Sequence, residues 1–161
     1  MNKIILHWTA GRGVPNSIEL RHYHFLIDKY GRINHGIFKP EDNENCYDNK
    51  YAPHTGGGNT GSIGVAICGM ANYKSPSQLG SYPINKIQCE TTFDLIAKLA
   101  KKYNIKIDPN HIMTHYEFGQ NNPKTTSAGK IDITHLPPYK NIAPDKIGDF
   151  IRDKIKWYYT K

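Results

Sequence analysis

The run SIGVAICG at positions 62–69 is the feature that most constrains the fold. It holds eight successive small, β-branched or apolar residues with no charge among them. Such a run is typical of a strand that is buried on both faces, at the centre of a sheet. A central strand of this kind, among further strands and amphipathic helices, predicts an α/β fold with a single mixed β-sheet flanked by helices.

The remaining elements follow from periodicity and turn residues. Apolar residues at three- and four-residue steps predict helices over 84–103 and 144–159. The segment SIELRH favours a short helix, and the other apolar runs predict strands at 3–8, 23–28 and 33–38, with a strand or strand-to-loop segment at 111–118. Residues 39–61 are rich in Asn, Asp and Gly and predict a long surface loop.

The length and composition indicate one globular domain. A chain of 161 residues can bury a sizeable core without disulfides, so we expect residues 1–161 to form a single domain. The three cysteines are odd in number and in no CxxC arrangement, which indicates free thiols. The net charge of +7 predicts an anionic partner, either nucleic acid, a membrane surface or an acidic cell-wall polymer. Because no dense basic cluster is present, nucleic acid is the weakest of these.

No apolar run approaches the roughly 20 residues of a membrane helix, and the first residues lack the apolar core of a signal peptide. We therefore expect a cytoplasmic chain without stable membrane insertion. The C-terminal helix predicted at 144–159 has a basic face. This face could make transient contact with an anionic envelope surface, or it could simply dock on the rest of the protein. Docking is the commoner fate of such a face.

Two histidines occupy positions that suit a metal site. His7 and His115 each follow an apolar run and precede a turn or a Gly-bearing loop, so both can point into a cleft. Asp132 would complete a set of two imidazoles and one carboxylate, which leaves an open position on a catalytic zinc and lowers the pKa of bound water to about 7. Taken singly, each of these residues is more often structural.

Lys130 stands two residues before Asp132. On an extended segment such a pair points the same way, so the ammonium group would lie beside the open face of the metal. There it would stabilise an oxyanion, whereas an isolated lysine is usually a solvated surface charge.

Several motifs in order resemble a known family. The stretches LHWTAG, YHFLID, PHTGGGN, SIGVAICG, MTHYEFG and GKID resemble those of the zinc-dependent N-acetylmuramoyl-L-alanine amidases of type 2, which include phage lysozymes of amidase type and peptidoglycan recognition proteins. The resemblance covers roughly residues 3–135. It implies the peptidoglycan recognition protein-like fold and a Zn²⁺ cofactor.

Residue by residue, the resemblance implies roles for seven side chains. His7, His115 and Asp132 correspond to the zinc ligands. Tyr23 and Lys130 correspond to catalytic residues. His54 and Asn59 correspond to the loop residues beside the substrate groove.

The resemblance has one gap. Some family members carry a catalytic glutamate in the strand that corresponds to SIGVAICG, where this chain has Ala66 and Cys68 and no acid. The catalytic chemistry would then rest on water activated by zinc together with Tyr23 and Lys130, as in the tyrosine-bearing phage enzymes.

The predicted function is hydrolysis of the amide bond between N-acetylmuramic acid and L-alanine in peptidoglycan, by an endolysin of a phage or prophage. A cytosolic amidase that recycles muropeptides is the nearest alternative. The alternative from another functional class is a non-catalytic peptidoglycan-binding module. Such modules usually lack a zinc ligand, whereas all three proposed ligand positions are occupied here.

Overall fold

The computed structural model describes residues 1–161 and contains one sheet of five strands in the order β3-β2-β4-β1-β5. The strands are β1 (Lys3–Trp8), β2 (Phe25–Ile27), β3 (Ile33–His35), β4 (Ser62–Ile67) and β5 (Ile112–Thr114). Strand β4 pairs in parallel with β1 and β2, β1 pairs in parallel with β5, and only β3 runs antiparallel, at one edge. The sheet is therefore mixed, as predicted, with β4 fully buried at its centre.

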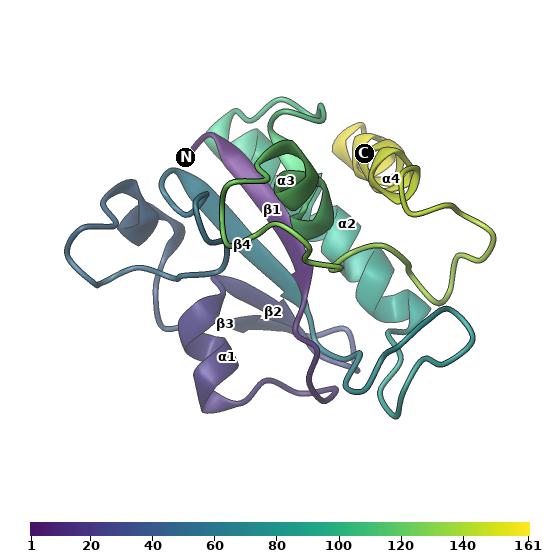
Figure 1. The fold of residues 1–161 in the computed structure, drawn as a ribbon. Coiled ribbons are helices and arrows are strands. Elements are labelled where there is room, and N and C mark those ends of the chain that lie inside the picture. Colours follow the sequence, from purple (N-terminus) through teal and green to yellow (C-terminus); the bar gives the residue numbers. More distant parts are fainter.

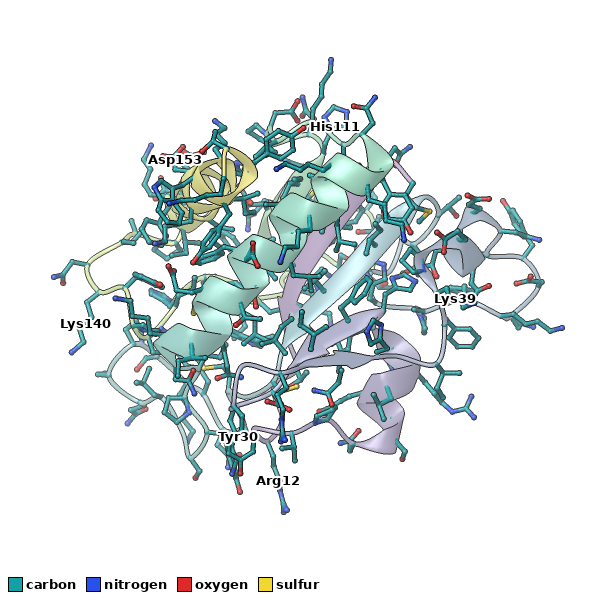
Figure 2. All side chains as sticks on the ribbon, turned by 180° about the vertical axis from the view of Figure 1, so that it is seen from behind. Arg12, Tyr30, Lys39, His111, Lys140 and Asp153 are labelled. Atoms are coloured by element: carbon teal, nitrogen blue, oxygen red, sulfur yellow. The ribbon has the colours of Figure 1, made fainter.

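Helices cover both faces of this sheet (Figure 1). The two long helices, α2 (Lys86–Tyr103) and α4 (Ile147–Tyr159), pack on one face, and Figure 2 shows from behind how α2 crosses the strands with α4 beside it. The two short helices, α1 (Ser17–His22) and α3 (His115–Asn121), lie on the other face. No helix is long and apolar enough to span a membrane.

Side chains of β1 alternate between these two layers. Ile4, Leu6 and Trp8 join the large apolar cluster under α2 and α4. Ile5 packs instead with Met113 and with Phe118 of α3, on the opposite face. Because neighbouring residues of a strand point to opposite faces, His7 lies on the side of the short helices.

Strand β4 shows the same division. Ile63, Val65 and Ile67 face the long helices, whereas the alternate positions hold only small side chains, at Gly64, Ala66 and Cys68. The large residues fill the core, and the small ones leave space on the face that carries His7.

The prediction of a strand or strand-to-loop segment at residues 111–118 was wrong for the second half of that range. Strand β5 ends at Thr114, and His115 begins helix α3. The Thr114 hydroxyl accepts the backbone N–H of Glu117, while the Glu117 carboxylate accepts the backbone N–H of Thr114, which forms a capping box. This T-x-x-E signal marks the helix start, but a helix of seven residues containing Gly119 has little apolar periodicity.

Other predicted elements are present with shorter bounds. The strand expected at 23–28 starts only at Phe25, three residues after α1 ends at His22. It ends where the Asp28 carboxylate accepts the backbone N–H groups of Tyr30 and Arg32 in the following turn. The long loop at 39–61 contains a short 3-10 helix, η1 (Pro40–Glu44).

The C-terminal helix is docked by its own basic residues. Arg152 is buried, and its guanidinium donates to the Ile112 carbonyl and to the carboxylates of Glu117 and Asp149. Lys154 donates to Glu90 of α2. These two cations therefore hold α4 against β5, α3 and α2, which favours docking over a free basic face.

Replacing Arg152 tests this docking. The substitution Arg152→Ala leaves the partly buried Glu117 without its cation and should lower the free energy of unfolding by about 3 kcal/mol, measured by urea titration. Lys156→Ala is the matched control on the same helix, because Lys156 forms only an exposed pair with Asp153 at 3.9 Å, and it should change stability little. Equal stability of the two variants would show that the Arg152 contacts do not hold the helix.

Candidate metal centre

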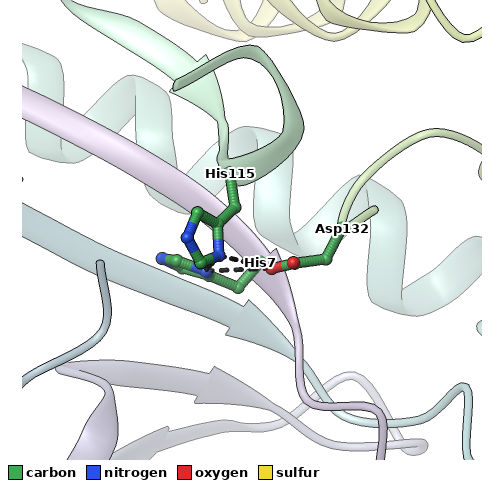
Figure 3. A group of neighbouring side chains, drawn as sticks. All are labelled: His7, His115 and Asp132. Atoms are coloured by element: carbon green, nitrogen blue, oxygen red, sulfur yellow. Dashed lines mark hydrogen bonds and ion pairs between the residues drawn. The ribbon is translucent and has the colours of Figure 1, made fainter. Parts of the chain in front are cut away.

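Three predicted ligands meet at the carboxyl edge of the sheet (Figure 3). His7 comes from the end of β1, His115 from the first residue of α3, and Asp132 from the loop that follows α3. Since β1 and β5 are adjacent parallel strands, the residues at their ends share one edge. All three side chains are buried.

The facing atoms of these residues have the spacing of a metal site. His7 Nδ1 and His115 Nδ1 are 3.2 Å apart, and Asp132 Oδ2 lies 3.0 Å from the first and 3.2 Å from the second. Tetrahedral zinc with bonds of about 2.0–2.1 Å separates its ligand atoms by roughly 3.3 Å. The three atoms thus occupy one face of a tetrahedron of nearly the right size.

Hydrogen bonds behind His115 determine which ring nitrogen carries the hydrogen. The Ser127 hydroxyl donates to the Gly56 carbonyl at 2.7 Å, because a carbonyl only accepts. The same oxygen lies 2.9 Å from His115 Nε2 and therefore accepts its N–H. In the neutral ring, Nδ1 of His115 is left with its lone pair toward the centre.

The same reasoning applies to His7. His54 Nε2 faces the Ser62 carbonyl at 3.3 Å and must donate to it, so His54 Nδ1 can only accept. His7 Nε2 lies 3.1 Å from that Nδ1 and 3.3 Å from the Thr55 hydroxyl, and it donates its N–H to these atoms. His7 Nδ1 is then also a bare acceptor.

Two imidazole lone pairs and one carboxylate oxygen therefore face each other without a hydrogen between them. Such a buried cluster of acceptors repels itself unless a cation lies among the three atoms, so the donor set fits a divalent metal. Burial lowers the pKa of His7, which favours the neutral ring that a metal requires.

A cavity of about 750 Å³ opens over the centre. Tyr23 and Lys130 both line it, with the Tyr23 ring centroid 5.2 Å from that of His7. Burial, with a smaller contribution from the Asp132 charge, raises the pKa of Tyr23, so its hydroxyl stays protonated at neutral pH. Lys130 is exposed at the cavity wall, and Asp132 lines the same cavity.

The two residues predicted to flank the substrate groove differ in position. His54 lines the cavity but is only 5% exposed, with both ring nitrogens engaged. Asn59 is absent from the cavity wall, and its side-chain oxygen accepts the backbone N–H of Thr55. Asn59 thus shapes the loop, and a direct substrate contact remains a prediction for His54 alone.

Three further histidines make contacts outside the group of candidate ligands. His24 is buried, accepts the Gly64 N–H and contacts Asn43, so its role is structural. His111 pairs with Asp108 at the surface. His135 contacts the hydroxyl of Tyr73, a cavity residue that the sequence did not single out.

Ser127 is the main residue that sequence reasoning missed. It lies 12 residues after His115 in sequence and bonds to a carbonyl 71 residues away. No local pattern distinguishes it from the other small polar residues in TTSAGK.

Comparison with protein families agrees with this geometry. The model of the family N-acetylmuramoyl-L-alanine amidase matches residues 1–131, and the chain belongs to this family. It is accordingly an amidase that acts on peptidoglycan. The match ends one residue before Asp132. A search of the curated proteins found no match.

A divalent metal should stabilise the folded chain if the acceptor cluster binds it. At a free zinc concentration about 100 times the Kd, the stabilisation is about 2.7 kcal/mol, which thermal unfolding with and without a chelator would detect as a higher Tm. Asp132→Asn removes the ligand charge and should abolish most of this shift. An identical Tm in zinc and in chelator would contradict metal binding.

Proposed function

We propose that this chain is a zinc-dependent enzyme that hydrolyses the amide bond between the lactyl group of N-acetylmuramic acid and L-alanine. The observation that carries the proposal is the set of three converging acceptors at the floor of a cavity, in a member of the amidase family. We further infer that residues 1–161 form one amidase domain, because Arg152 ties α4 to Glu117 of α3.

In this proposal His7, His115 and Asp132 hold the zinc ion. Two neutral imidazoles and one carboxylate would leave a bound divalent ion with a net positive charge. When bound there, zinc supplies a Lewis acid for the amide carbonyl and lowers the pKa of water.

Lys130 and Tyr23 act on the charges that develop in the substrate. The Lys130 ammonium stabilises the oxyanion that forms when water adds to the carbonyl carbon. The Tyr23 hydroxyl, which burial keeps protonated, donates a hydrogen bond to the leaving amine of L-alanine or relays to this amine the proton that the attacking water loses.

Strand β4 offers no carboxylate for this chemistry. Ala66 in the strand and Cys68 just after it lie on the site face, and burial raises the pKa of the Cys68 thiol to about 12. Cys68 therefore stays a neutral thiol and is unsuited to act as a base. This favours the tyrosine-based form of the reaction.

The biological role that we propose is that of a phage or prophage endolysin. The net charge of +7 suits an enzyme that works on an anionic cell wall. A cytosolic amidase for muropeptide recycling is the alternative, and the two are separated by the substrate: an endolysin digests intact sacculi, whereas a recycling enzyme prefers soluble anhydromuropeptides.

Product analysis tests the reaction directly. Mass spectrometry of sacculi digested by the zinc-loaded protein should reveal peptides with new free L-alanine amino termini. Cleavage of a glycosidic bond or within the stem peptide would contradict the proposed amidase reaction. Binding of sacculi without cleavage would indicate a peptidoglycan-binding module instead.

Substitutions separate the proposed metal ligands from the other catalytic residues. His7→Ala and Asp132→Ala should abolish both zinc binding and turnover. Tyr23→Phe and Lys130→Ala should keep zinc and lower kcat about 10²- to 10³-fold, because each removes one stabiliser of the transition state. Near wild-type turnover in either ligand variant would refute the site, and unchanged kcat in Tyr23→Phe or Lys130→Ala would remove that residue from the mechanism.

A further inference from the structure

One loop lies behind both imidazole ligands. Residues 53–61 form the last part of the segment between η1 and β4, and they contain PHTGGGN. We call this part the GGG loop. Its His54 and Thr55 contact His7, and its Gly56 carbonyl contacts Ser127, which contacts His115. Two histidines that lie 108 residues apart in sequence are thus supported from a single segment.

The contacts of His54 are directional. Its Nε2 donates to the Ser62 carbonyl, and its Nδ1 lies 2.8 Å from the Thr55 hydroxyl and 3.1 Å from His7 Nε2. Whether His7 donates to His54 or to Thr55, His7 Nε2 carries the hydrogen and Nδ1 faces the metal.

Two glycines provide room for this arrangement. A Cβ on Gly64 of β4 would lie 2.4 Å from Cγ of the His54 ring, so any larger residue there would displace the imidazole. A Cβ on Gly56 would lie 1.9 Å from Thr126 Oγ1, beside Ser127. The close approach of the loop to the ligand residues therefore depends on missing side chains.

The GGG loop is itself anchored at both ends. The Asn43 side chain donates to the carbonyls of Ala52 and Asn59 and accepts the N–H of Ala52. His24 contacts the same Asn43 side chain. A buried polar network of this kind holds the carbonyls and His54 at fixed positions.

We propose that His54 and Ser127 are positioning residues that fix the tautomer and orientation of His7 and His115, and so set the affinity of the site for zinc. This inference rests on the proposed zinc function. It assigns to His54 a role through His7 instead of the substrate contact that the sequence suggested. Partners of this kind typically contribute 10- to 100-fold to metal affinity.

Zinc affinity measured by competition with a chromophoric chelator tests the proposal. His54→Ala and Ser127→Ala should each weaken zinc binding 10- to 100-fold, with Ser127→Ala as the milder change if His54→Ala fails to fold. The controls are His111→Ala, which removes a surface histidine, and Ser77→Ala, which removes an exposed hydroxyl; both should bind zinc like the wild type.

Nitrogen-correlated NMR of the zinc-loaded wild type supplies a second readout. We expect the ring hydrogens of His7, His54 and His115 on Nε2. A hydrogen on Nδ1 of His54 would overturn the proposed positioning role of His54.

Three further outcomes are distinct. Folded Ser127→Ala or His54→Ala protein with wild-type zinc affinity would overturn the positioning role. If His54→Ala raises KM at saturating zinc and leaves the zinc affinity unchanged, His54 contacts the substrate instead of positioning His7. Failure of the wild type to bind zinc at all would instead overturn the proposed function on which this inference rests.

Discussion

The mutual repulsion of three buried acceptors is the constraint on which the site depends. His7, His115 and Asp132 direct two ring nitrogens and one carboxylate oxygen at a common centre, 3.0–3.2 Å apart. Folding brings these atoms together although they would separate in water, so the surrounding structure must hold them. The parallel pairing of β1 with β5 places the two histidines, and the loop after α3 adds the carboxylate.

Strand β4 carries large side chains on one face and small ones on the other, which makes this site compatible with a stable core. Its β-branched residues fill the layer under α2, while Gly64 and Ala66 leave space for His54 and His7 on the other side. Core and site therefore share one strand without competing for volume. The sheet supports the reaction by packing, and the loops supply most of the groups that line the cavity.

The C-terminal helix extends this support beyond the residues that match the family. Arg152 reaches across to Glu117, and Glu117 also closes the capping box at Thr114, one residue before His115. Gly148 lets this helix approach closely, because a Cβ there would lie 2.3 Å from the Glu117 carboxylate. A residue of α4 is thereby connected to the start of the helix that bears a candidate ligand.

The sequence by itself determined the α/β class and the bounds of β1 and α1, and it predicted the residue types of the candidate metal centre. These features depend on local periodicity, on capping residues and on the chemistry of the donor atoms, all of which can be read along the chain. Helix α3 was missed because seven residues carry too little periodicity, although the capping box at Thr114 marks its start. Only the tertiary structure decided that Asn59 shapes a loop, that Arg152 is buried, and that Ser127 and His54 stand behind the two imidazoles. Each of these contacts joins residues that strand order or loop packing brings together. Strand order and loop packing leave no periodic signal in the sequence.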